Sequence, residues 1–199
     1  MALGVLVSFV LYLRPGELLR ITSKCLVRPS STAPWWGVIL HPVEDVTPGK
    51  VGLTDESLLC DQAAHGQRLG EFLSVLANLP PDSQFLGLRP GDLKRCWSET
   101  LSSMQVDKYD LYQLRHGGAS FDLLQRNRSP LEVKLRLRHT SDSSLARYGK
   151  ATRAQKEAGN VEPAVQALGN YVLQNIAHVF HNPRSLPIEL VRSADSKAN

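Results

Sequence analysis

Side chains able to do phosphate chemistry gather between positions 112 and 148. Tyr112 and Arg115 are three residues apart, so they share one face of a helix. Arg138 and His139 are adjacent, and Tyr148 follows His139 by nine residues. An arginine offers a planar fork of donors that fits phosphate oxygens, a histidine titrates near neutral pH, and a tyrosine oxygen can act as a nucleophile. These are the residue types needed to bind a phosphate group and attack it.

The same stretch carries the excess positive charge of the chain. Residues 108–156 hold eleven lysines and arginines against four acidic residues, a net charge of +7, whereas the rest of the 199-residue chain carries −3. Basic charge concentrated in one segment is typical of a polyanion partner, most often nucleic acid. A solvated basic face without a partner is an equally good interpretation of the charge alone.

The composition is that of a globular protein. Hydrophobic residues make up 42% of the chain and charged residues 21%, which excludes a disordered chain, a collagen-like repeat and a polytopic membrane protein. The three cysteines contain no CxxC pair, so the sequence predicts neither a disulfide framework nor a zinc site, and free thiols favour a reducing, intracellular setting. No metal-ligand spacing is found among the histidines His41, His65, His178 and His181.

The first thirteen residues are almost wholly apolar. No positive charge precedes them, no cleavage site follows them, and they are shorter than the ~20 residues that a membrane span needs. They therefore predict a buried core helix. Pro15 then opens a second helix, with Glu17 near its N-terminus.

The remaining patterns predict an α+β fold, mostly α, with a small antiparallel sheet. Extended stretches at 36–41, from Lys50, and at 58–60 flank a loop at 28–34 and a turn at Pro48-Gly49. Helical periodicity follows over residues 65–79, 91–104, 110–125, 129–138, 142–152 and 163–181, with a polar, linker-like stretch at 154–162. The helix over 110–125 carries an apolar stripe of Leu111, Leu114, Phe121 and Leu124, and its paired glycines allow another backbone to approach closely.

Four segments, taken in order, resemble the catalytic domain of the tyrosine recombinases, the phage integrase family, over roughly residues 5–180. Leu13-Arg14-Pro15-Gly16-Glu17-Leu18 resembles the first arginine box. Pro48-Gly49-Lys50-Val51-Gly52 resembles the hairpin that carries the family's catalytic lysine. Tyr112-Gln113-Leu114-Arg115-His116-Gly117 resembles the second box, and Arg138-His139 with Tyr148 resembles the closing box.

The resemblance implies a DNA strand transferase that works without a metal or other cofactor. Tyr148 would be the nucleophile, giving a 3′-phosphotyrosyl link and a free 5′-hydroxyl. Arg14 and Arg115 would stabilise the charge on the phosphate, Lys50 would protonate the leaving oxygen, and His139 would donate a hydrogen bond. Glu17 would orient the cations, and Tyr112 stands where the family has a histidine. DNA contacts are expected from Arg136, Arg138, Arg147, Lys150 and Arg153.

Two departures from the family leave other interpretations open. Tyr112 cannot serve as an acid or base of the histidine type near neutral pH, and the chain begins inside the catalytic domain, without the family's preceding core-binding domain. A catalytically inactive DNA-binding remnant of a mobile-element recombinase is the second hypothesis, and an unrelated helical interaction protein is the third. Taken alone, Arg14 with Glu17 fits a surface ion pair of a helix, and Tyr112 fits a core aromatic.

The expected organisation is a recombinase-like domain over residues 1–182 and a polar tail over 183–199. The helix at 163–181 would either complete its own core or dock on a neighbouring protomer. The expected partners are double-stranded DNA and further copies of the chain on that DNA, with no membrane. The expected location is intracellular and DNA-associated, which means nuclear in a eukaryote.

Overall fold

The computed structural model describes residues 2–43, 56–62, 66–103, 109–138, 148, 156, 159–161, 163–175, 178–179, 182 and 186–187. The chain forms two compact units, residues 1–149 and 150–199. The predicted domain over 1–182 includes parts of both units, and its boundary stays a prediction.

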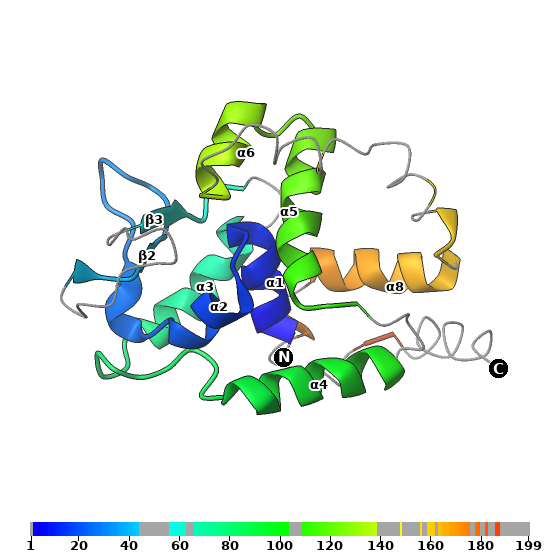
Figure 1. Cartoon of the computed structure of the whole chain (residues 1–199), viewed down its shortest axis with the longest axis horizontal. Helices are drawn as coiled ribbons and strands as arrows, with labels where there is room; N and C mark the ends of the chain where they lie inside the picture. The colour runs from blue at the N-terminus through cyan, green and yellow to red at the C-terminus, as the bar shows by residue number, and fades with distance from the viewer. Residues whose placement is uncertain are drawn as a thin grey trace. The chain divides into compact units, whose positions relative to one another are not determined.

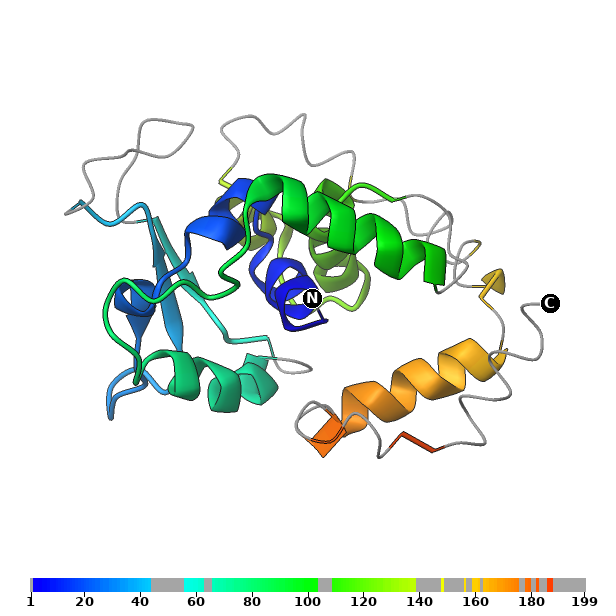
Figure 2. The ribbon, with the colours of Figure 1, turned by 90° about the horizontal axis from the view of Figure 1, so that it is seen from below.

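The first unit is built around its apolar N-terminal helix. The predicted core helix is confirmed as α1 (Ala2–Leu11), which buries Val7, Val10 and Leu11. Figures 1 and 2 show α1 in the middle of this unit, with α3 (Gly66–Leu76), α4 (Pro90–Ser103) and α5 (Tyr112–Leu124) around it. Among the described residues, no helix is both long enough and apolar enough to cross a membrane.

A second short helix, α2 (Pro15–Arg20), follows directly after residue 14. Pro15 occupies its first turn, where a missing backbone N–H costs nothing, as the sequence predicts. The backbone N–H of Arg14 donates to Glu17 Oε2 at 2.7 Å, which fixes the start of the helix.

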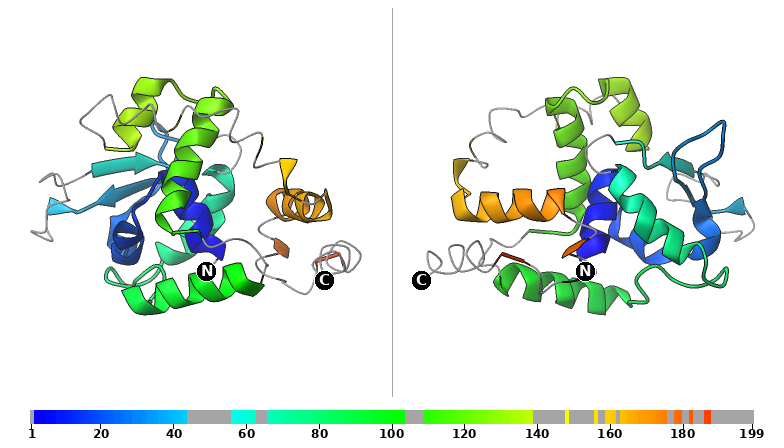
Figure 3. Two further views of the ribbon diagram at one scale, coloured as in Figure 1. Left: turned by 45° about the vertical axis from the view of Figure 1, so that its right-hand side comes forward. Right: turned by 180° about the vertical axis from the view of Figure 1, so that it is seen from behind.

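The predicted small antiparallel sheet is confirmed, with three strands in the order β1-β2-β3. A 3-10 turn, η1 (Ser23–Cys25), leads into β1 (Leu26–Val27), and β2 (Gly37–Leu40) pairs with β3 (Glu56–Leu59). Figure 3 shows β2 and β3 side by side, and Leu40 lies opposite Glu56 in their register. The predicted turn at Pro48-Gly49 and the residue Lys50 lie outside the described residues.

The helices expected after the sheet are present wherever the chain is described. The predicted stripe of α3 is buried, and it consists of Leu69, Phe72, Leu73 and Leu76. Helix α6 (Pro130–Arg136) begins at Ser129, whose Oγ accepts the backbone N–H of Glu132 at 3.3 Å. The predicted helix at 142–152 lies outside the described residues apart from Tyr148.

Helix α5 buries a different face from the apolar one expected. Its buried residues are Arg115, Gly118, Ala119 and Asp122, whereas Leu124 is exposed and Leu111, Leu114 and Phe121 are only half-buried. The reason is steric, because the backbone of α1 lies against Gly118. A Cβ added there would overlap the carbonyl oxygen of Phe9. The close approach expected at the paired glycines is therefore confirmed, and it turns the small residues of α5 inward.

The second unit contains α8 (Pro163–Gln174), which confirms most of the helix predicted over 163–181. None of the residues of α8 is buried. Val165 is exposed, and Leu168 and Val172 are half-buried. The two hypotheses for this helix, a core of its own or docking on a second copy, stay open.

Candidate functional site

The first member of the candidate site, Arg14, lies at the start of α2. Its Nη1 donates to Glu17 Oε1, and its side chain is 18% exposed, whereas that of Glu17 is only 5% exposed. One oxygen of Glu17 accepts from the Arg14 guanidinium and the other accepts from the Arg14 backbone N–H. The carboxylate therefore holds the Arg14 side chain in a fixed orientation relative to its own backbone.

Arg115 of α5 lies at the centre of the site and is fully buried, with 0% exposure. Its Nη1 donates to the carbonyl oxygen of Tyr12 at 2.6 Å, and its Nη2 donates to that of Leu137. Burial is the main cause that lowers the pKa of Arg115, and the positive charge of Arg14 adds to it, while Glu17, Tyr112 and Tyr148 act in the opposite direction. Residues from three separate segments of the chain therefore lie within electrostatic range of one guanidinium.

Arg138 joins α2 to the sheet. Its Nη2 donates to Glu17 Oε2 at 2.6 Å, and its Nε lies 3.5 Å from Glu56 Oε2. Burial lowers the pKa of Arg138 to about 10, although Glu17 and Glu56 raise it, so the side chain remains charged at neutral pH. The sequence predicts that Arg138 contacts DNA, but in the structure its guanidinium donates to groups inside the protein.

Three aromatic rings lie in a row beside Arg115. Tyr112 and His116, one turn apart on α5, meet edge to face with centroids 5.0 Å apart. His116 stacks on Tyr148 at 5.0 Å with an interplanar angle of 26°. Tyr148 is 1% exposed and belongs to a buried cluster with Tyr12, Ala119, Val133 and Leu137. Tyr112 is 37% exposed, and the guanidinium carbon of Arg115 lies 6.0 Å from the centroid of its ring.

The structure thus brings together the described residues of the predicted site with the exception of Arg136. These are Arg14, Glu17, Tyr112, Arg115, Arg138 and Tyr148. Five further residues of the prediction lie outside the described residues, and they are Lys50, His139, Arg147, Lys150 and Arg153.

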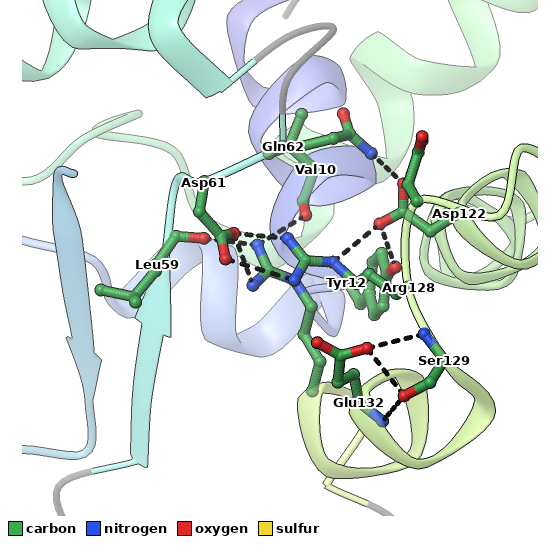
Figure 4. A network of polar contacts seen from close by, with 11 residues as sticks. Val10, Tyr12, Leu59, Asp61, Gln62, Asp122, Arg128, Ser129 and Glu132 are labelled. Atoms are coloured by element: carbon green, nitrogen blue, oxygen red, sulfur yellow. Dashed lines mark hydrogen bonds and ion pairs between the residues drawn. The ribbon is translucent and has the colours of Figure 1, made fainter. Parts of the chain in front are cut away.

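A second buried polar network, unforeseen from the sequence, lies beside this site (Figure 4). Asp122 of α5 is fully buried and accepts hydrogen bonds from Tyr12 Oη, from Gln62 Nε2 at 2.7 Å, and from Arg128 Nε at 3.1 Å. Burial and the hydrogen bond to Asp122 raise the pKa of Tyr12, so its phenol stays protonated and donates. The network therefore holds α1, α5 and the end of β3 together.

Arg136, expected to contact DNA, belongs to this network. Its Nη1 lies 3.2 Å from Asp61 Oδ1, and its Nη2 donates to the carbonyl oxygens of Val10, at 3.1 Å, and Leu59. Arg128 Nη2 and Nη1 also donate to Asp61. One signal in the sequence could have indicated the network, because Arg115, Gly118 and Asp122 fall on one helical face, where a charged residue needs an internal partner.

Three side chains near the first arginine box could hold a metal ion. One ligand atom each of Glu17, His41 and Glu56 lies within 4.8 Å of the other two. The residues come from α2, from the position after β2, and from the first position of β3, so no local spacing marks them in the sequence.

The arrangement separates side chains that reach solvent from side chains that do not. Arg14 and Tyr112 reach solvent and can contact an anion such as a phosphate, whereas Arg115 and Tyr148 are closed off by their packing. In this arrangement neither Arg115 nor Tyr148 is open to a phosphate in solvent. No protein-family model matches the chain, and neither a curated protein nor a solved structure is significantly similar to it.

Proposed function

We propose that the first unit is a DNA strand transferase of the tyrosine-recombinase type, with Tyr148 as its nucleophile. The observation that carries the proposal is that Arg14, Tyr112 and Tyr148 all lie within electrostatic range of the Arg115 guanidinium. These residues come from three of the boxes on which the resemblance depends, and more than 130 positions of sequence separate the first from the last. A chance match of short motifs would not be expected to bring them to one place in the fold.

In the proposed reaction, the Tyr148 oxygen attacks the phosphorus of a phosphodiester. A bond from this oxygen to phosphorus forms, the bond from phosphorus to the 5′ oxygen breaks, and the phenol proton passes to solvent water. Lys50 supplies a proton to the departing 5′ oxygen. Arg14 and Arg115 stabilise the negative charge on the non-bridging oxygens, and Glu17 keeps the fork of Arg14 in place.

A second candidate is a DNA-binding protein that keeps this arrangement without turnover. This candidate is favoured by the burial of Arg115, because both of its terminal nitrogens already donate to backbone carbonyls rather than facing solvent. Turnover would require those donors to turn toward a phosphate and Tyr148 to leave its buried position.

Covalent trapping on nicked duplex DNA distinguishes the two candidates. The full chain is incubated with the DNA and denatured in detergent, and protein–DNA adducts are separated by electrophoresis. We expect an adduct with the wild type and with Tyr109→Phe, an exposed tyrosine that serves as the control. Tyr148→Phe should abolish it.

The possible results point to different conclusions. An adduct that survives Tyr148→Phe would rule out Tyr148 as the nucleophile. Binding that weakens steeply with salt but gives no adduct would favour the second candidate, because phosphate contacts release counterions. Absence of any DNA binding would overturn both.

A further inference from the structure

Glu56 is a buried carboxylate whose polar contacts are incomplete. Its side chain is 6% exposed, yet among the described residues neither of its oxygens accepts a hydrogen bond. The ion pair of Oε2 with Arg138 Nε is long, at 3.5 Å, and that nitrogen also donates no hydrogen bond within the described part. A buried carboxylate without hydrogen bonds is strongly unfavourable unless a water molecule or a cation binds to it.

His41 brings a nitrogen ligand to the same place. It follows β2 directly and has a φ of +52°, a left-handed conformation that residues other than glycine seldom adopt. Such a conformation persists only where the surrounding structure enforces it, and it is common at functional sites. The potential ligand atom of His41 lies within 4.8 Å of those of Glu17 and Glu56.

Space for water lies next to two of these three side chains, Glu17 and His41. A pocket of about 480 Å³ is lined by Glu17, His41, Arg20 and Gln84, among others. Two carboxylates and one imidazole leave coordination positions that water must fill, and this pocket can supply it. The ligand atoms around a bound metal ion lie about 3–4 Å from one another. Shifts of about 1 Å in these three side chains would therefore bring their ligand atoms to coordinating distance of one ion.

The neighbouring arginines do not exclude a cation here. Arg14 donates to Glu17 through its backbone N–H and its guanidinium, and Arg138 donates once. The two oxygens of a carboxylate offer about four lone-pair sites, so one remains for a metal. Carboxylates that bind metals in proteins are commonly held by such outer hydrogen bonds. Neither oxygen of Glu56 accepts a hydrogen bond within the described residues, so both can bind a metal ion. Glu56 and His41 would therefore form the main part of the site.

We propose that Glu17, His41 and Glu56 form a binding site for one divalent transition-metal ion, of the class of Zn²⁺ or Mn²⁺. The imidazole favours these ions over Mg²⁺, which prefers oxygen ligands and binds water tightly. The site differs from the sequence prediction of no metal. It goes beyond the proposed strand transfer and does not depend on it.

The test is a titration of the full chain, freed of metal with a chelator and dialysed. Isothermal titration calorimetry with ZnCl₂, MnCl₂ and MgCl₂ should show one ion bound per chain, with Mg²⁺ the weakest, and the metal should raise Tm. Glu56→Gln and His41→Gly should each weaken binding at least tenfold. Glycine suits the left-handed position of His41, so this second variant should keep the fold.

Two matched controls complete the test. Glu71→Gln and His178→Ala alter an exposed glutamate and an exposed histidine, and both should bind like the wild type. No heat of binding and no change in Tm with any of the ions would overturn the proposal, and Glu56 would then hold a proton or a water molecule instead. Binding that is unchanged in Glu56→Gln and His41→Gly would also overturn it, because the ion would sit elsewhere.

Discussion

Asp122 is the buried acid on which the second polar network depends. Besides Tyr12, Gln62 and Arg128, it accepts a hydrogen bond from Asn127 Nδ2 at 3.1 Å, so all of its capacity is used inside the protein. Desolvation offsets much of the attraction in such a network, so its net contribution to stability is small. Breaking it is different, because the donors that remain cannot reach water.

We therefore predict that Asp122→Asn destabilises the protein strongly. The amide of asparagine keeps the shape of the carboxylate, but its NH₂ group would face the N–H and O–H groups that now donate to Asp122. The substitution also removes the negative charge that pairs with Arg128. The expected loss is about 3–5 kcal/mol, measured by urea denaturation. Asp92→Asn is the control, since Asp92 on α4 pairs only with the exposed arginines Arg89 and Arg95 among the ion pairs of the described residues. Its loss should stay within about 1 kcal/mol. A loss below about 1 kcal/mol for Asp122→Asn would show that water fills the network.

At the scale of residues, the sequence indicates which buried side chains need a hydrogen-bond partner, but it does not indicate which groups supply it. Arg115, next to two glycines, is expected to need a partner if it is buried. The partners are carbonyl groups at Tyr12 and Leu137, which only the packed ends of α1 and α6 bring to it. Glu17, His41 and Glu56 meet for the same reason, because sheet pairing and the position of α2 set their distances.

At the scale of elements, the contact between α1 and α5 decides which residues are buried. A Cβ on Gly118 would lie 2.9 Å from both Phe9 C and Tyr12 Cδ1, besides overlapping the Phe9 carbonyl oxygen. Backbone atoms cannot move aside as a flexible side chain can, so the two helices would have to separate. A Cβ on Gly117 would meet only the Phe9 ring, at 3.4 Å, which is an ordinary contact.

We predict that Gly118→Ala lowers stability by at least about 3 kcal/mol, as overpacking against a fixed backbone does. Gly117→Ala is the neighbouring control, and it should change stability by about 1 kcal/mol or less, because alanine also favours the helix. Thermal and urea unfolding of both variants measure the difference. Equal stabilities would mean that α1 does not approach α5 at this point.

Most elements in the described residues could be predicted from the sequence, but the buried face of α5 could not. Periodicity indicates the helices, and proline with a capping residue marks where α2 and α6 begin. The apolar stripe of α5 is misleading because its two charged residues, Arg115 and Asp122, find internal partners, and its glycine lets α1 come close. The hydrophobic pattern alone predicts neither the internal partners of the charged residues nor the close approach of α1.

At the scale of the whole molecule, the described part of the basic stretch exposes only some of its cations, Arg126 and Lys156 among them. Arg128, Arg136 and Arg138 lie mostly inside the fold. They pair there with Asp61, Glu17 and Glu56, acidic residues that lie outside the basic stretch of the sequence. Net charge along a segment therefore overstates the charge that a DNA backbone would meet. Among the described residues of the candidate site, Arg14 is a partly exposed cation.

The first unit also contains every buried hydrophobic residue found in the described chain, from Leu6 to Tyr148. We therefore predict that residues 1–149 fold without the second unit. The shortened chain should unfold cooperatively in urea and show dispersed NMR amide signals, since the buried hydrophobic residues of the described chain and the residues that bind Asp122 all lie within it. Residues 150–199 alone should show little helix by circular dichroism, because α8 buries none of its residues and a 12-residue helix is marginal in water. A non-cooperative transition for 1–149, or a stable fold for 150–199, would show that the core extends beyond the first unit.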